Sequence, residues 1–339
     1  MSRGNVALFV PHVGCPHKCA FCDQRTITGK TAVPHAEDVR RVCSQALAEM
    51  DSGTNGVCAS ESEIAFFGGS FTAIKREYMT ELLEAAAEFV GEGRFKGIRL
   101  STRPDCISRE ILDILKAHGV TSVELGAQSM NDRVLELNER GHTVEDVYAA
   151  SRLIKEYGFE LGLQIMTGLY GSGLAEELET RRRVLEIAPD TVRIYPVCVL
   201  KGTRLASAYE SGEYTLIPMD EMLDIVAADA QAFSDAGIKI LRIGLHASDG
   251  VEKDLAAGYY HPALGELVRG RMVRAFIESR ITEDRAEIFC GKGMISAVKG
   301  HKKENIAYFA KRGVKLDIRP DDSLGSKEIM IGREIYRCI

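Results

Sequence analysis

The sequence lacks any segment suited to crossing a membrane or directing secretion. No apolar run approaches the roughly 18 residues needed to span a bilayer, and the short run 6–10 contains no cleavage signal. The nine cysteines are an odd number in a chain of 339 residues, which argues against a secreted disulfide framework. We therefore expect a cytoplasmic protein, with no membrane association, whose reduced thiols can bind a metal or a cluster.

The chain also lacks low-complexity tracts and any repeat other than an alternation of apolar runs with amphipathic stretches. This alternation predicts a parallel α/β sheet, and six units predict a partial barrel, because a closed one needs eight. The expected strands are 7–11, 63–67, 97–101, 122–125, 160–166 and 191–196, and the expected helices are 36–50, 76–89, 109–117, 144–157 and 175–187.

The pattern changes near residue 215. We expect a partial (β/α)6 barrel of the TIM type in residues 1–215 and a small α+β C-terminal domain in residues 216–339. Within the second part, Pro262 is suited to opening a helix after a glycine-rich turn region. The other expected elements there are helices at 219–236 and 304–312, and strands at 240–245, 314–318, 328–331 and 335–339.

Three cysteines, Cys15, Cys19 and Cys22, stand close together in the loop after the first expected strand. Cysteine thiolates bind iron–sulfur clusters, and three ligands leave one iron of a cubane open. Such an open position can chelate another molecule, as catalytic zinc sites do. A structural zinc site would need a fourth ligand, for which His12 and His17 are near enough in the sequence. The spacing favours a cluster and leaves zinc as the alternative.

The CxxxCxxC spacing, with Phe21 before the last cysteine, resembles the signature of the radical S-adenosylmethionine (SAM) superfamily. Residues 11–16 and 23–24 around it are similar to the branch that contains the catalytic subunit of the Elongator complex. The resemblance covers about residues 5–215 and implies a [4Fe–4S] cluster on the three cysteines, with SAM on the open iron. The cofactor would supply a 5′-deoxyadenosyl radical that abstracts hydrogen from the substrate, after reduction by a flavodoxin or ferredoxin.

Glycines and polar residues follow the other expected strands, at the sheet edge where such folds place their chemistry. Gly68 and Gly69 allow close approach of backbone to a ligand. The resemblance implies that this pair binds the SAM amino group. Ser70 stands where many family members carry an acidic residue.

Two further residues are typical of ligand contacts. Gln128 ends a strand and needs a partner if it is buried, and Arg140 can hold a carboxylate with two hydrogen bonds. By resemblance, Gln128 would contact the SAM ribose and Arg140 the SAM carboxylate, while Ser101 matches another ribose ligand. Gln164 is expected to line the same cavity, and Tyr195 either faces a substrate or packs.

The Elongator-like branch modifies the wobble uridine of transfer RNA and carries an acetyltransferase domain and an N-terminal extension. Here Cys15 comes almost at the start, and no acetyl-CoA loop is evident in the last hundred residues. We therefore expect radical SAM chemistry with tRNA modification as the candidate reaction, without assuming the same product. Coproporphyrinogen oxidases and haem chaperones are an alternative, but they show CxxCxC where Asp23 and Gln24 follow Cys22. A non-enzymatic iron–sulfur carrier would need no SAM site, and a zinc-containing nucleic-acid module fits poorly with the acidic first part.

The C-terminal part has the opposite charge balance. Residues 1–239 contain 25 Lys and Arg against 35 Asp and Glu, and residues 240–339 contain 18 against 14. Segments 241–245 and 257–268 resemble a small domain appended to many bacterial radical SAM proteins. An anionic partner such as tRNA would bind here through phosphates rather than bases. The candidate residues are Arg269, Arg271, Arg274, Lys299, Lys302, Lys303, Lys311 and Arg312.

Overall fold

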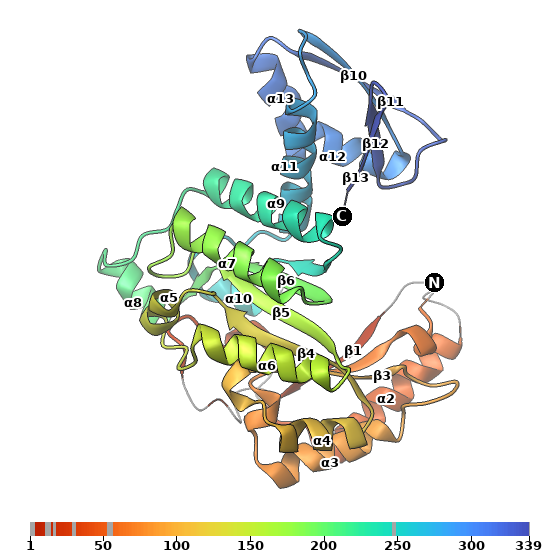
Figure 1. Ribbon diagram of the computed structural model, residues 1–339, viewed down its shortest axis with the longest axis vertical. Helices are drawn as coiled ribbons and strands as arrows, with labels where there is room; N and C mark the ends of the chain where they lie inside the picture. The colour runs from red at the N-terminus through yellow and green to blue at the C-terminus, as the bar shows by residue number, and fades with distance from the viewer. Residues whose placement is uncertain are drawn as a thin grey trace.

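The computed structural model describes residues 4–10, 15, 18–28, 32–52, 57–245 and 249–338. Within these residues the largest sheet has seven parallel strands, in the spatial order β1-β2-β3-β4-β5-β6-β8 (Figure 1). Parallel neighbours need crossover connections, and helices provide them on one face of the sheet. The strands are β1 (Asn5–Val10), β2 (Glu63–Gly68), β3 (Gly97–Thr102), β4 (Val120–Gln128), β5 (Glu160–Thr167), β6 (Thr191–Pro196) and β8 (Lys239–Ile243).

Helix starts in this part follow local capping chemistry. The Ser108 side chain accepts a hydrogen bond from the Ile111 amide, and Thr143 forms a reciprocal capping box with Asp146. The helices are α1 (Gln24–Thr28), α2 (Ala36–Asp51), α3 (Arg76–Ala87), α4 (Arg109–Ala117), α5 (Asp132–Leu137), α6 (Val144–Glu156), α7 (Leu174–Ile187), α8 (Arg204–Glu210) and α9 (Met219–Asp235).

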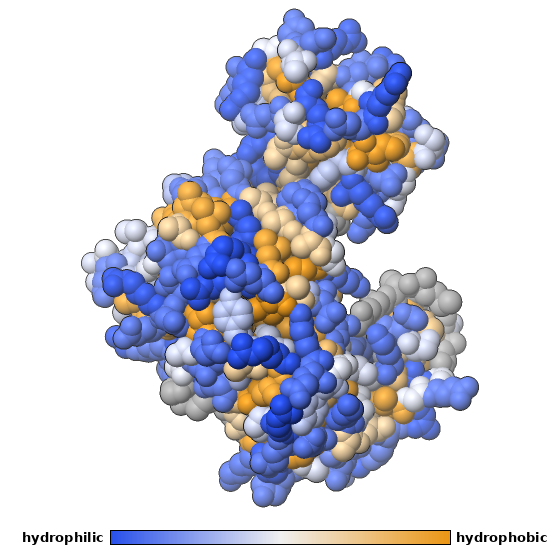
Figure 2. Space-filling model, in the orientation of Figure 1, coloured by the Kyte–Doolittle hydropathy of each residue, from blue (hydrophilic) through white to orange (hydrophobic). Residues whose placement is uncertain are grey.

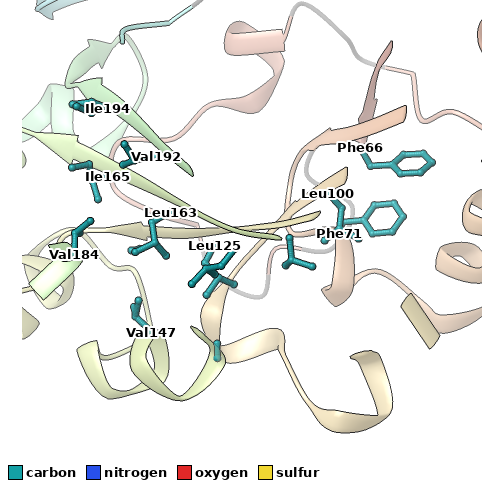
Figure 3. Packing of buried hydrophobic residues seen from close by; sticks show 14 of the residues in the cluster. Phe66, Phe71, Leu100, Leu125, Val147, Leu163, Ile165, Val184, Val192 and Ile194 are labelled. Atoms are coloured by element: carbon teal, nitrogen blue, oxygen red, sulfur yellow. The ribbon is translucent and has the colours of Figure 1, made fainter. Parts of the chain in front are cut away.

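The strands have an apolar face and a polar face. Figure 3 shows the apolar side chains, which pack between the sheet and its helices: Phe66, Leu100, Leu125 and Leu163 from the strands lie with Val147 of α6. Because successive strand residues point to opposite faces, their neighbours point into the barrel. These interior residues include Glu63, Arg99, Ser101, Glu124, Gln164 and Arg193. A closed barrel of this type is filled by branched apolar residues, so the polar interior marks a place for a ligand.

The C-terminal unit stands beyond α9 in Figure 1. Helix α11 (Leu264–Glu278) packs against α9, and a mixed sheet of four strands forms from the described residues, in the order β11-β10-β12-β13. A separate hydrophobic cluster, including Val273, Ile288, Phe309 and Ile329, lies between this sheet and the helices. The elements are α10 (Asp249–Asp254), β10 (Arg285–Cys290), α12 (Ile295–Lys299), α13 (Glu304–Lys311), β11 (Lys315–Pro320), β12 (Glu328–Ile331) and β13 (Glu334–Arg337), and β7 (Cys198–Leu200) pairs with β9 (Leu255–Gly258).

The expected fold, a partial barrel with a small α+β C-terminal unit, is confirmed. The strand expected at 240–245 is β8, and it extends the large sheet by pairing in parallel with β6. The division at residue 215 stays a prediction. Pro11 and Ile339, which end two of the expected strands, lie outside the described residues. Among the described residues, no helix is long and apolar enough to cross a membrane.

Candidate cluster and SAM site

One cavity of about 590 Å³ lies at the carboxyl ends of strands β2 to β5. Every residue that we predicted for the site lines it, although the residues come from separate loops and strands. The structure therefore brings together the complete predicted set: Cys15, Cys19, Cys22, Gly68, Gly69, Ser70, Ser101, Gln128, Arg140 and Gln164.

The three cysteines lie on the loop after β1. Cys19 is buried, and Cys15 and Cys22 are half-buried. The amide of Ala20 donates to the carbonyl of Asn138 at 3.0 Å, which ties this loop to the segment after α5. Among the described residues, no three Cys, His, Asp or Glu side chains converge tightly enough to hold a single metal ion. The alternative zinc ligands His12 and His17 lie outside the described residues.

Arg140 connects the cysteine loop to strand β4. Its Nη1 donates to Cys19 Sγ at 3.1 Å and its Nη2 donates to the Gly126 carbonyl at 2.6 Å. The side chain is 6% exposed, and its Nε has no hydrogen-bond partner among the described residues. A buried donor without an acceptor is costly, so this guanidinium is suited to a further anionic partner in the cavity.

Two glycines leave space where a side chain would intrude. Gly68 has a φ of +115°, and a Cβ there would lie 2.9 Å from the Val10 carbonyl oxygen. A Cβ on Gly126 would lie 2.8 Å from Gln128 Nε2 and 3.2 Å from Arg140 Nη2. Gly68 requires glycine, because its φ is positive and the backbone of Val10 lies against it. At Gly126 a side chain would instead displace the ends of Gln128 and Arg140, the two cavity residues beside it. Gly126 was not among the predicted site residues, although it belongs to the same motif as Gln128.

Gln128 reaches the cavity through a backbone irregularity. It has a φ of 64°, uncommon for a residue with a side chain, and the register of β4 against β5 shifts between Gly126 and Gln128. Such a bulge re-aims side chains next to functional sites. Beside it, Gln164 Nε2 donates to Ser101 Oγ at 3.1 Å and to Glu124 Oε2 at 2.8 Å, which fixes both cavity residues.

Ser70 lines the cavity, but its hydroxyl is already used within the protein. It shares a hydrogen bond of 2.9 Å with Thr102 Oγ1 and accepts one from the Arg103 amide at 3.2 Å. These bonds tie the loop after β2 to the loop after β3. Ser70 therefore positions the glycine pair, whatever further contact it makes.

Arg103 is a cavity residue that the predicted set did not include. It is 3% exposed, and its Nε and Nη2 each donate to Asp105 at 2.9 Å. Its Nη1 is buried and has no partner among the described residues. The signal for Arg103 in the sequence was an arginine directly after a strand, at the edge where ligands bind.

The neighbouring His142 carries no charge. Burial and the nearby guanidiniums of Arg140 and Arg103 lower the pKa of His142 to about 3, so its imidazole is neutral.

These features fit a cluster together with a zwitterionic ligand. Each thiolate of a cubane sits on its own iron, so thiols spread along a wall suit it better than they suit one ion. Two buried guanidinium nitrogens, one of Arg103 and one of Arg140, have no acceptor in the described part of the chain, and Gly126 leaves space beside Arg140. Arg140 would hold the ligand's carboxylate, and Gln128 and Ser101 would bind its hydroxyl groups. The cluster would be bound by the three cysteines, Cys15, Cys19 and Cys22. When bound, the cluster and SAM supply an electron and a carbon-centred radical.

Comparison with known proteins identifies the family. The model of the radical SAM superfamily matches residues 9–184, more than half of the chain, and the model of the radical SAM C-terminal domain matches residues 189–274. The chain belongs to the radical SAM superfamily. It is thus a radical SAM enzyme with a [4Fe–4S] cluster and SAM as its cofactors. This excludes the two non-enzymatic alternatives, an iron–sulfur carrier and a zinc-containing nucleic-acid module.

Individual relatives are similar over part of their length. The tRNA uridine(34) acetyltransferase of Dehalococcoides mccartyi is 27% identical over 308 residues, which cover 81% of this chain and 64% of the relative. The tRNA uridine(34) acetyltransferase of Methanocaldococcus jannaschii is 27% identical over 366 residues, 94% of this chain and 64% of the relative. This chain thus spans a little under two thirds of the length of these acetyltransferases.

Two further proteins are similar to this chain. Elongator complex protein 3 of Homo sapiens is 27% identical over 256 residues, which cover 68% of this chain and 45% of the relative. The solved structure of archaeal Methanocaldococcus infernus Elp3, with residues 1–46 deleted, has a TM-score of 0.63 at 23% identity. It covers 82% of this chain and 63% of that one, and shows that the two proteins share a fold.

Proposed function

We propose that this enzyme modifies transfer RNA in the cytoplasm, with a flavodoxin or ferredoxin as its electron donor. The observation that carries the site assignment is the single cavity in which the three thiols, the glycine pair and Arg140 meet. Transfer RNA is the substrate named for the acetyltransferase relatives, and the C-terminal part of this chain has an excess of basic residues.

The roles of the site residues are part of this proposal. Cys15, Cys19 and Cys22 hold three irons, and the backbone at Gly68 and Gly69 receives the SAM amino group. The guanidinium of Arg140 pairs with the SAM carboxylate in a charge-assisted hydrogen bond, which is about twice as strong as a neutral one. Ser101 and Gln128 bind the ribose; Gln164 positions Ser101, and Ser70 positions the glycine loop.

We also propose a division of labour along the chain. Residues 1–215 contain the cluster and SAM site and most of the barrel interior, which receives the reacting part of the substrate, and residues 216–339 form an accessory unit that holds the rest of the substrate. The second part joins the first through β8, which pairs with β6, and through α9, which packs against α7. Its own hydrophobic cluster lies beyond α9, between α11 and the mixed sheet. Such an arrangement lets the small unit vary with the substrate while the barrel keeps the radical chemistry.

The test is anaerobic reconstitution with iron and sulfide, followed by SAM and dithionite. Formation of 5′-deoxyadenosine is expected, and a variant with Cys15, Cys19 and Cys22 all changed to alanine should lack both the cluster's iron and the product. Bulk tRNA from cells that lack the enzyme should then acquire a new nucleoside, detected by mass spectrometry of its digest. Cleavage of SAM without any RNA product would leave the radical chemistry standing and remove tRNA as the substrate.

A further inference from the structure

A second cavity, of about 800 Å³, occupies the barrel interior next to the site described above. It falls within the range that encloses small ligands. The two cavities share part of their walls, so a molecule in the second one lies against the cluster and SAM site. The shared residues are Phe21, Cys22, Gly68, Ser101, Gln128 and Gln164.

The wall of this interior cavity is cationic. It contains Arg99, Arg193, Lys239 and Arg242, and no Asp or Glu among the described residues lines it. Two of these cations are neutralised by buried glutamates that do not line the cavity. Arg99 donates to Glu63 at 2.9 Å and to Glu124 at 3.1 Å, and the Nε and Nη2 of Arg193 donate to Glu124 at 2.7 and 3.1 Å.

Arg242 differs from these neutralised arginines. It lies on β8 beside Arg193 of β6 in the parallel register, and so points into the same interior. Its Nε donates to the Gly244 carbonyl at 2.8 Å and its Nη2 donates to the Leu245 carbonyl at 3.0 Å. No carboxylate of the described residues forms an ion pair with it. Two carbonyls thus hold a half-buried guanidinium in place without a counter-charge, which is costly in the absence of a ligand.

Burial lowers the pKa of Arg242, and the charge of Arg193 lowers it further against an opposing effect of Tyr195, as expected for a buried cation without a carboxylate partner. Aromatic side chains, Phe9, Phe67 and Tyr195, line the same cavity. A flat ring can stack on such surfaces, and stacking on aromatic side chains is a common way to hold a nucleobase.

We propose that Arg242 binds the phosphate of a nucleotide inside the barrel, with the base held on the aromatic wall. This inference rests on the proposed function, because it treats the barrel interior as the substrate chamber. A nucleotide extruded from an RNA brings its phosphate into the chamber, and a free nucleotide brings the same group. Both sources would present the same two groups: a phosphate bound to the Arg242 guanidinium and a base stacked on the aromatic side chains.

The test compares uridine monophosphate with uridine, by equilibrium dialysis against the anaerobically reconstituted protein. Wild type should bind the monophosphate more tightly by a factor of about ten or more, as a hydrogen bond to a charged group predicts. Arg242→Gln should bring the two affinities together, and Arg242→Lys should keep part of the difference. The matched control is Arg152→Gln, since Arg152 is exposed on α6 and pairs with Glu145; it should behave as wild type.

A uridine-rich RNA oligonucleotide forms the second arm of the experiment. Tighter binding of the oligonucleotide than of the monophosphate identifies a polymer as the source of the phosphate, and the reverse identifies a free nucleotide. Equal affinities of wild type for uridine and its monophosphate would overturn the proposal. So would no binding of either at about 10 mM, a concentration that detects even millimolar sites. If Arg242→Gln does not fold, the proposal is still tested by the preference of wild type for the monophosphate over uridine and by the reduced preference expected of Arg242→Lys. The proposed function is tested separately by the new nucleoside expected in bulk tRNA, which does not depend on how uridine monophosphate binds.

Discussion

At the scale of single residues, Arg140 connects the cysteine loop with the SAM-facing wall through its bonds to Cys19 and Gly126. Arg140→Ala should lower SAM affinity about ten- to a hundredfold, since a lost hydrogen bond to a charged group costs on the order of 1.5–3 kcal/mol. Equilibrium binding of SAM to reconstituted protein measures this. Iron content should stay at the wild-type level, because the three thiols remain. Unchanged SAM affinity would remove Arg140 from the site.

A site residue could be predicted from the sequence where it belongs to a short motif of neighbouring residues. The cysteines, the glycine pair and Gln128 stand in short motifs at strand ends, so these motifs and their resemblance to the family predicted them. Arg103 has no such spacing, because its role depends on being buried beside Cys19 and on an orphaned nitrogen that only packing creates. The bond between Ser70 and Thr102 was equally hidden, since it joins residues on different strands.

At the scale of elements, the end of β2 depends on a glycine. Gly68→Ala should destabilise the protein by about 1–3 kcal/mol, because an alanine there would be strained and would press on the Val10 carbonyl. A matched control is Gly265→Ala in α11, where φ is ordinary and the space around the new Cβ is open. That change should be neutral or stabilising by up to about 1 kcal/mol. Urea unfolding of both variants is the measurement, and equal effects would contradict the role of Gly68.

The loop after β5 is held by a buried carboxyl group. Glu177 on α7 accepts hydrogen bonds from the Gly168 amide at 2.8 Å and from Ser172 Oγ at 2.7 Å. Burial raises its pKa to about 7 from the ordinary 4.5. Between these values the folded state binds more protons than the unfolded state, so this group's stabilisation is full below pH 4.5 and is lost as pH rises through 7.

Glu177→Gln should therefore remove a decline in stability that wild type shows between about pH 4.5 and 7, of at most about 3 kcal/mol. Asp229 is buried nearby and its raised pKa gives a slope of the same sign, so the difference between the variant and wild type isolates Glu177. Unfolding midpoints in urea across this pH range are sufficient. Parallel curves for the two proteins would show that folding does not raise the pKa of Glu177.

Elements with a regular apolar period were predictable, and those defined by tertiary contacts were not. The barrel strands and helices match their expected ranges to within a few residues, because each buries one face on the sheet. The pair β7 and β9 was missed, since each strand is very short and finds its partner far along the chain. The bulge at Gln128 has no sequence signal either, because a residue other than glycine adopts a positive φ there.

At the scale of the whole molecule, the surface in Figure 2 is mostly hydrophilic, with hydrophobic patches on both units. The expected basic face of the C-terminal unit is narrower than its sequence suggested. Arg271 is 7% exposed and pairs with Asp220 and Asp224, while Arg274 pairs with Asp224. Arg312 stacks on Tyr308 and faces Glu278. The exposed lysines remain as the candidates for phosphate contacts.

Four exposed lysines lie on α12, on α13 and between these two helices. They form no ion pair with the described acidic residues. Changing Lys299, Lys302, Lys303 and Lys311 together to Glu should reduce affinity for bulk tRNA severalfold or more and flatten its salt dependence. Each neutralised phosphate releases counterions, so wild-type binding should weaken steeply with salt. Filter binding at two salt concentrations measures both effects, and SAM cleavage without RNA should be unchanged, since no described residue of this group lines the cluster cavity. Wild-type affinity in the quadruple variant would place the RNA elsewhere on the molecule, whereas no binding by wild type at low salt would leave a small molecule or a protein as the substrate.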